Sequence, residues 1–398
     1  MRRVGAWATV LVLSACGGGS GKTIPLGAIL SMTGQLANIG AEQAQAAQLA
    51  VEEINRGGGV LGAKLSLLTK DDASESARGQ AAASELIAAG VPALFGAIAS
   101  QITLDISTVT IPAGIVQISG SSTSPALTTV ADSGFLSRTC SSDALQGKLL
   151  ADRARVKGFS KVAIIHLPGA YGDGLSATFA ASYLSGTVTK NVQYVEKQPS
   201  YTSLLSDILA DSPDAILLIA YPADGAQIIK DYTTSFAAKG TFWFFTDALE
   251  DTGFLDAVGA SNFTFPHEAT GGATPIGPRY DAYATAYKTR WGTESGAGTF
   301  SANVYDAVYL TALAIQAAGK SDGPSIRDAL PAVSTGGTVY AAADFAAAAT
   351  AARAGQDVNY EGASGPVDLD ANGDVVAPYD IWKVMGGKIV TVEQSILP

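Results

Sequence analysis

The sequence predicts an α/β protein built from two doubly wound, parallel-sheet lobes. The chain has 398 residues, which exceeds the size at which a single core usually keeps growing. Short apolar runs alternate with amphipathic helical segments, as in βαβ units, and this alternation occurs in two successive series. A hydrophobic fraction of 47% with 15% charged residues is typical of a globular chain.

The first series begins at residue 24. The helix at 41–55 carries its apolar residues on one side and ends at the glycines of "RGGG", which favour helix termination. The complete series has predicted strands at 24–30, 65–69, 93–98 and 115–118, and predicted helices at 41–55, 74–89 and 103–109.

The second series begins near Asp143, whose carboxylate is expected to cap the helix that follows it. Its predicted helices lie at 144–157, 174–183, 202–210 and 225–237, and its predicted strands at 162–166, 192–196, 215–220 and 242–245.

Two long helices at 278–291 and 302–318 come next, and a strand pair at 379–384 and 388–392 ends the chain. Because these helices have no sheet of their own, we expect them to pack on the first unit, which makes both domains discontinuous. The expected boundaries are 24–140 plus 271–355 for lobe 1, and 141–270 plus 356–398 for lobe 2.

The first residues are expected to be a targeting segment. Two arginines precede an apolar run at 4–13, which is too short to span a bilayer but suits a secretory signal. The run ends in "LSAC", which looks like a bacterial lipobox: residues 1–16 would form the signal, Cys16 would carry lipid, and 17–23 would be a flexible tether. The alternative is an ordinary signal peptide cut near Ala15.

The composition argues against several classes of function. A net charge of −11 disfavours nucleic-acid binding, which needs clustered cations. Cys140 is the only cysteine that follows Cys16, so it has no partner for a disulfide in the mature chain. The two histidines lack metal-ligand spacing. We therefore expect no metal, no cofactor and no enzymatic activity. The stretch 368–375 resembles the opening of a calcium loop but lacks its final glutamate, and an Asn-Gly turn is the favoured interpretation.

Hydroxyl groups follow two neighbouring predicted strands. "SGSSTS" at 119–124 and "ASQIT" at 99–103 both stand at the carboxyl ends of strands, where ligand sites of open α/β sheets lie. Helix N-termini and hydroxyls there can hold an anion such as a carboxylate. The alternative is a helix cap and a local turn.

At these residues the sequence resembles the leucine/isoleucine/valine-binding family of type I periplasmic binding proteins, which serve ABC importers. The matching segments are "IPLGAILSMTGQLANIGAEQAQAAQLAVEEINRGGGVLG", "TKDDASE", "ISGSSTSPALT", "RTCSSDALQG", "VAIIHLPGAYGDGL", "PDAILLIAYPADG" and "EGASGPVDLDANGDV". The resemblance implies two α/β lobes joined by three hinge strands, which close over a small ligand.

The resemblance also implies roles for individual residues. In lobe 1, Ser100, Ser122 and Thr123 match residues that hold the α-carboxylate of an amino acid and help hold its ammonium. Phe300 matches an apolar residue of the side-chain pocket.

In lobe 2, Tyr171 and Tyr221 match aromatic residues that cover the ligand, and Asp247 matches the acid that pairs with the ammonium. Glu250 and Asp251 are nearby competitors for the role of Asp247.

The sequence departs from the family pattern at several positions. Ile39 replaces a frequent aromatic residue, and Gln101 adds a polar group that could reach the ligand side chain, so side-chain preference is expected to be altered. Ser74 and Ala99 stand where related chains often carry a disulfide.

The resemblance therefore predicts an extracytoplasmic, monomeric solute-binding protein, held to the membrane by a lipid anchor only. It would deliver an amino acid, most simply an aliphatic one, to an ABC importer permease. The alternatives are the same fold binding an amide, urea or aromatic carboxylate, and a sensor module without transport.

Overall fold

The computed structural model describes residues 22–296 and 298–397. The predicted signal, Cys16 and nearly all of the predicted tether lie outside this part of the chain. Within it, no helix combines the length and the apolar character that a membrane crossing requires.

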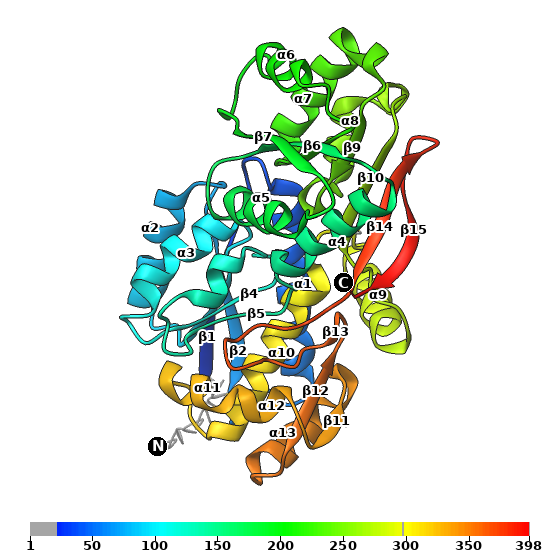
Figure 1. Cartoon of the computed structure of the whole chain (residues 1–398). Helices are drawn as coiled ribbons and strands as arrows, with labels where there is room; N and C mark the ends of the chain where they lie inside the picture. The colour runs from blue at the N-terminus through cyan, green and yellow to red at the C-terminus, as the bar shows by residue number, and fades with distance from the viewer. Residues whose placement is uncertain (1–21, 297, 398) are drawn as a thin grey trace, which may run out of the picture.

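Lobe 1 is built on a five-stranded parallel sheet in the order β2-β1-β3-β4-β5 (Figure 1). The strands are β1 (Thr23–Leu30), β2 (Lys64–Asp71), β3 (Ala93–Gly96), β4 (Val116–Ser119) and β5 (Leu136–Arg138). The helices that connect them are α1 (Ala37–Arg56), α2 (Ser76–Ala88) and α3 (Ser100–Thr110). Each predicted strand and helix of the first series has a counterpart in the structure, whereas β5 was not predicted.

Lobe 2 contains a seven-stranded sheet in the order β15-β14-β10-β9-β8-β6-β7. Its strands are β6 (Lys161–His166), β7 (Thr187–Gln193), β8 (Ala215–Ile219), β9 (Phe242–Phe245), β10 (His267–Gly272), β14 (Tyr379–Met385) and β15 (Lys388–Ile396). Its helices are α4 (Asp143–Val156), α5 (Ala170–Ser182), α6 (Thr202–Ala210), α7 (Pro222–Ser235) and α8 (Thr252–Val258). The antiparallel pairs of this sheet are β10–β14 and β14–β15, at one edge.

The late helices return to lobe 1, as predicted. These elements are α9 (Pro278–Trp291), α10 (Ser301–Ala318), α11 (Gly323–Ala329), α12 (Pro331–Ser334), α13 (Phe345–Arg353) and a small sheet of β11 (Thr338–Tyr340), β12 (Val358–Gly362) and β13 (Gly365–Pro366). α10 is buried along almost its whole length in the same core as β1, β3 and β4.

One expected boundary differs from the structure. We expected the chain from residue 356 onward to belong to lobe 2, but Val358, Tyr360 and Val375 pack in the core of lobe 1. The reason is that β12 pairs with β11 and buries alternate side chains against α10. The other boundaries remain predictions.

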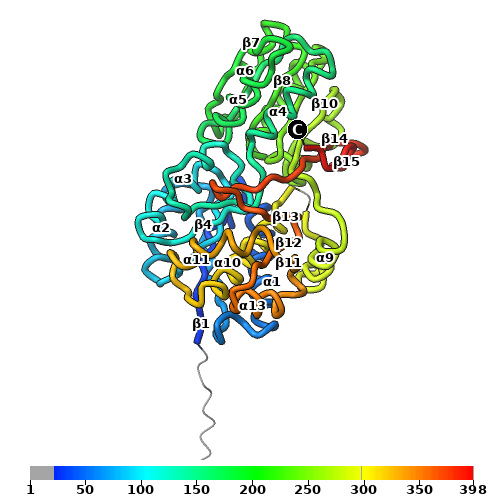
Figure 2. Tube along the Cα trace, turned by 60° about the horizontal axis from the view of Figure 1, so that its bottom comes forward, coloured from blue at the N-terminus to red at the C-terminus, as the bar shows by residue number. Residues whose placement is uncertain are grey.

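The chain crosses between the lobes after β5, after β10 and before β14, and Figure 2 shows the last crossing as a reddish segment between the two bodies. These crossings are hydrogen-bonded to one another. Ser141 Oγ donates to Ala377 O at 2.7 Å, and Ala273 N donates to Pro378 O at 3.0 Å. The crossings therefore form a connected hinge.

Two local predictions were wrong. Asp143 does not cap α4, because the hydroxyl of Ser142 accepts from Ala144 N while Asp143 is turned inward and buried. β7 begins at Thr187, five residues before the predicted start at 192, because none of its residues is fully buried and the strand gives only a weak apolar signal.

Candidate ligand-binding site

A cavity of about 340 Å³, part of it open to solvent, lies where the two lobes meet. The residues that line it are Leu36, Ile39, Ile98, Ser100, Ser121, Thr123, Tyr171, Tyr221, Asp247, Ala248 and Phe300. They come from the carboxyl ends of sheet strands and from the starts of α1, α3, α5, α7 and α10. Such strand ends and helix N-termini are where α/β folds bind small, charged ligands.

Hydroxyl groups form the polar wall contributed by lobe 1. Ser100 is the first residue of α3, and its Oγ accepts from Ser124 N at 3.2 Å, so its own proton remains available to an acceptor in the cavity. Ser121 and Thr123 line the same side, and Ser121 Oγ has no hydrogen-bond partner within the described structure.

Ser122 is placed differently from its neighbours. Its Oγ lies 2.7 Å from Thr103 Oγ1 and donates to Ala97 O and Ile98 O, both at 3.1 Å. It does not line the cavity, and Ser121 lines it instead. The hydroxyl of Ser122 therefore ties the loop to the end of β3.

Asp247 is the acidic residue that lobe 2 brings to the cavity. It begins a short 3-10 turn after β9, and its Oδ1 accepts from the hydroxyl of Tyr171 at 2.6 Å. Burial raises the pKa of its carboxyl above the ordinary value, although the hydrogen bond from Tyr171 partly offsets this effect. Glu250 is also buried but does not line the cavity.

A second buried carboxylate, Asp143, lies in the same region. Its Oδ2 accepts from Thr123 Oγ1 at 2.9 Å, while its Oδ1 has no partner among the described residues. Burial, and after it the negative charge of Asp247, raises the pKa of Asp143 well above its usual range. Among the described residues no ion pair joins either carboxylate to a cation, and the charge of Arg138 offsets the raised pKa of Asp143 only in part, so the pair favours a positively charged group between the lobes.

Aromatic and aliphatic side chains complete the cavity. The rings of Tyr171 and Tyr221 stack with centroids 6.0 Å apart and planes within 3°. Tyr221 also packs against apolar residues of both lobes. Ile39 and Phe300 contribute apolar surface, and Phe300 adopts a left-handed conformation with φ of 54° directly before α10.

Gln101 lies outside the cavity. Its Nε2 donates to Asp105 Oδ1 at 3.1 Å, and its Oε1 accepts from Ala170 N at 3.2 Å. Gln101 therefore caps the start of α5 from the opposite lobe, a contact between lobes rather than a cavity-lining position.

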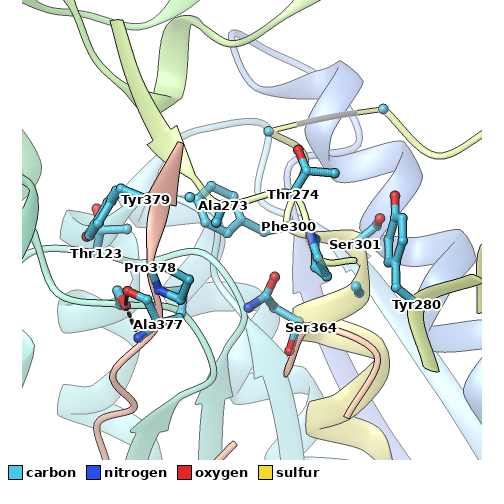
Figure 3. A pocket seen from close by; sticks show the side chains of 18 residues that line it. Thr123, Ala273, Thr274, Tyr280, Phe300, Ser301, Ser364, Ala377, Pro378 and Tyr379 are labelled. Atoms are coloured by element: carbon cyan, nitrogen blue, oxygen red, sulfur yellow. Dashed lines mark hydrogen bonds between the residues drawn. The ribbon is translucent and has the colours of Figure 1, made fainter. Parts of the chain in front are cut away.

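A second cavity of about 650 Å³, including space open to solvent, adjoins the first at the hinge (Figure 3). Thr123 and Phe300 line both cavities, and Figure 3 shows Phe300 beside Ala273 of the second hinge crossing. The side chain of Phe300 therefore contributes to the boundary of the ligand cavity.

Sequence reasoning identified most of these positions but missed Leu36, Ile98, Ser121 and Ala248, and it also missed Asp143, which is buried nearby without lining the cavity. Leu36 and Ile98 could have been included, because Leu36 lies in the same predicted loop as Ile39 and Ile98 ends the predicted strand just before Ser100. Asp143 carried no such signal, because an acidic residue before a helix is most simply a cap.

The comparisons with known proteins agree with this architecture. The family described as periplasmic binding protein matches residues 23–388. The Leu/Ile/Val-binding protein BraC3 of Rhizobium johnstonii is 29% identical, covering 93% of this chain and 94% of that protein.

Two solved structures share the fold. One is the branched-chain amino acid transporter substrate-binding protein LivJ of Streptococcus pneumoniae with isoleucine, with a TM-score of 0.79 at 23% identity, covering 95% of this chain and 100% of that one. The other is a solute-binding protein of an ABC transporter from R. palustris with benzoate, with a TM-score of 0.76 at 19% identity, covering 94% and 98%. This chain thus belongs to the periplasmic binding protein family of extracytoplasmic solute-binding proteins.

Proposed function

We propose that this protein captures an α-amino acid between its lobes and delivers it to an ABC importer. The observation that carries the proposal is the opposition of two kinds of polar group across one cavity. Hydroxyls of Ser100 and Ser121 stand in lobe 1, where Thr123 donates its own proton to Asp143, and the buried carboxylate of Asp247 stands in lobe 2. A zwitterion matches both, because its carboxylate takes donors and its ammonium takes the negative charge.

Asp143 strengthens this assignment. Its unpartnered Oδ1 is an acceptor that the protein itself does not satisfy, and an ammonium group would supply the missing donor. Since a buried, unpaired charge is costly, a ligand that neutralises the carboxylates favours the closed arrangement of the lobes. Closure is then the signal that a permease can recognise.

The apolar wall favours an aliphatic side chain on the ligand. Leu36, Ile39 and Ile98 supply flexible apolar surface, and the paired rings of Tyr171 and Tyr221 cover it from the other lobe. BraC3, a relative along nearly the whole chain, is named for leucine, isoleucine and valine, which supports the same ligand class.

The cellular setting is part of the proposal. A monomer anchored by lipid at Cys16 would remain at the membrane surface beside its permease, while the tether at 17–23 allowed both lobes to dock. Mass spectrometry of the membrane-extracted protein tests the anchor, because a lipidated Cys16 adds the mass of its acyl chains to the N-terminal peptide. An N-terminus beyond Cys16 would contradict it.

An aromatic carboxylate is the second candidate, because the R. palustris protein with the same fold holds benzoate. Benzoate has no cation for Asp247 and Asp143, so this candidate fits the site less well. Refolded protein should be titrated calorimetrically with the twenty amino acids and with benzoates. We expect binding of aliphatic amino acids; binding of benzoates alone would contradict the proposed function.

A further inference from the structure

Arg138 is a fully buried arginine that does not line the ligand cavity. It is the last residue of β5, and its guanidinium holds the loop of hydroxyl residues from behind. Its Nη1 donates to the main-chain oxygens of three consecutive residues, Ser122 at 3.4 Å and Thr123 and Ser124 at 2.9 Å each.

These bonds determine which way the loop peptides face. In a trans peptide the C=O and the following N–H point in opposite directions. Because the carbonyls of Ser122 and Thr123 face Arg138, the amides of Thr123 and Ser124 face away from it. The amide of Ser124 indeed meets the Oγ of Ser100, which lines the cavity. Arg138 thereby directs donors toward the ligand side.

Asp374 holds Arg138 in this position. Its carboxylate accepts from Arg138 Nε and Nη2, both at 2.7 Å, in a two-pronged ion pair. Thr128 completes the contact, donating its hydroxyl to Asp374 at 2.7 Å and accepting from Nη2 at 2.8 Å. The positive charge of Arg138 is therefore matched within the protein.

Asp374 belongs to the "DANGD" turn that resembles a calcium loop in sequence. The carboxylate of Asp370 accepts from the amides of Asn372 and Asp374, and Gly373 has φ of +73°. A Cβ at Gly373 would lie 2.6 Å from Ser137 Oγ, so only glycine lets the turn rest on β5. The turn also accepts from Arg138 N at 2.8 Å through Gly373 O.

We infer that Arg138 and Asp374 are positioning residues for recognition of the ligand carboxylate, acting through the main chain of residues 122–124. This inference rests on the proposed function, since it requires a ligand with a carboxylate. It differs from direct attraction by the arginine charge, because Asp374 and the carbonyls occupy the guanidinium.

Asp374→Asn separates the two explanations. If Arg138 attracted the ligand by charge, removing the negative charge of Asp374 would tighten the binding of carboxylates. If Arg138 positions the loop, the same change loosens the guanidinium and weakens binding. We expect the dissociation constant for the preferred amino acid to rise about tenfold or more, as for a lost charge-assisted contact.

Glu268→Gln is the matched control. Glu268 is a buried carboxylate on β10 that accepts from Arg153 at 2.5 Å and pairs with Lys157 at 2.8 Å, but it does not line the cavity. Its loss should lower the melting temperature as a general structural change would, while the dissociation constant stays within about twofold of the parent.

A second readout compares each amino acid with its primary amide, which lacks the carboxylate charge. In Asp374→Asn the amino acid should lose more affinity than its amide, whereas a merely structural defect would affect both equally. Thr128→Val serves if Asp374→Asn does not fold. It removes two hydrogen bonds of the cluster, one to Asp374 and one from Arg138, and the amino acid should again lose more affinity than its amide, by about two- to fivefold. Asp374→Glu, which keeps the carboxylate, should restore binding in part.

The outcomes are distinguishable. If the parent protein binds no ligand with a carboxylate, the proposed function fails and this inference fails with it. If the parent binds amino acids but the folded Asp374→Asn or Thr128→Val variant binds them equally or more tightly, only the inference fails. Equal losses for amino acid and amide would also overturn it.

Discussion

The two lobes prepare their halves of the ligand cavity in opposite ways. Arg138 supports the hydroxyl loop of lobe 1 from the side away from the cavity. Its Nη1 donates to the main-chain oxygens of three consecutive loop residues. The carboxylates of lobe 2 are buried without a cation of their own, and Asp143 Oδ1 has no partner among the described residues. The main chain of the first half is held by the protein itself, and of its described hydroxyls only that of Ser121 lacks a partner, whereas the carboxylates of the second half are completed only by a ligand.

This difference assigns separate tasks to the lobes. A satisfied loop keeps its geometry whether or not a ligand is bound, so lobe 1 supplies shape and donor direction. Unpaired carboxylates make closure unfavourable until a cation binds, so lobe 2 makes closure depend on a positively charged group of the ligand.

The largest expected effect comes from Asp247→Asn. Removing one partner of a buried charge pair typically costs about 3 kcal/mol or more, which is roughly a hundredfold in affinity. Calorimetric titration with the preferred amino acid measures the change. Asp256→Asn, an exposed acid on α8, is the control and should leave affinity unchanged. Nearly parental binding by Asp247→Asn would remove the acid from the ammonium site.

A smaller contrast is expected between two neighbouring hydroxyls of lobe 1. Ser100→Ala deletes a donor that faces the cavity and should weaken binding about tenfold. Ser122→Ala deletes bonds to Ala97 O and Ile98 O and should lower the melting temperature more than it weakens binding. Paired thermal and calorimetric measurements of both variants decide this. The reverse ranking would contradict the placement of these hydroxyls.

The affinity for amino acids should fall as the pH decreases. The pKa values of Asp143 and Asp247 are raised, so in mildly acidic solution the pair retains protons that an ammonium ligand must displace. Binding therefore releases protons, and affinity changes by up to about tenfold per pH unit for each proton released. Titration in two buffers with different ionisation enthalpies counts these protons. Binding without proton release across the acidic range would refute the interpretation.

The smallest effect on binding is expected at Asp306, a buried carboxylate of lobe 1. Tyr360, Ala363 and Ser364 all donate to it, yet burial raises its pKa to about 6. The folded state therefore holds a proton that the unfolded chain loses near 3.8, so stability falls as the pH rises from about 4 to about 6.

Asp306→Asn should flatten this part of the pH profile without changing ligand affinity. Urea unfolding at several pH values measures the slope. An unchanged slope in the variant would show that another group is responsible. A large loss of affinity would show that the satisfied carboxylate of lobe 1 is not independent of the site.

The fold was largely predictable because its core elements follow apolar periodicity. The strand at 242–245 and the helix at 278–291 agree with β9 and α9 at both ends. α13 was missed because alanine occupies both its buried and its exposed positions, so its buried side is not distinguished by residue type. β10 was missed because "HEATGG" lacks a run of branched residues, and its pairing with β9 and β14 supplies what local propensity does not.

The sequence predicted the candidate site best at positions where the residue type suggests a single role in ligand binding. The positions of Ser100, Tyr171, Tyr221 and Asp247 at the cavity agree with the prediction, although their ligand contacts remain a prediction. The positions of Ser122 and Gln101 could not be read from the sequence, because adjacent loop residues point in different directions only once the loop is built. The role proposed for Asp374 depends on a contact with Arg138, 236 positions away in the chain.

The discontinuous core of lobe 1 has a consequence for the order in which the protein can be made. Its central helix, α10, starts at Ser301, and its last core strand and loop extend to Val375. During synthesis the sheet of lobe 1 therefore emerges first, together with α1, but acquires the rest of its covering layer last. Until then its apolar face is covered only in part and the nascent chain cannot finish folding. A chain that must pass through a translocation channel before it folds benefits from such a late-closing core.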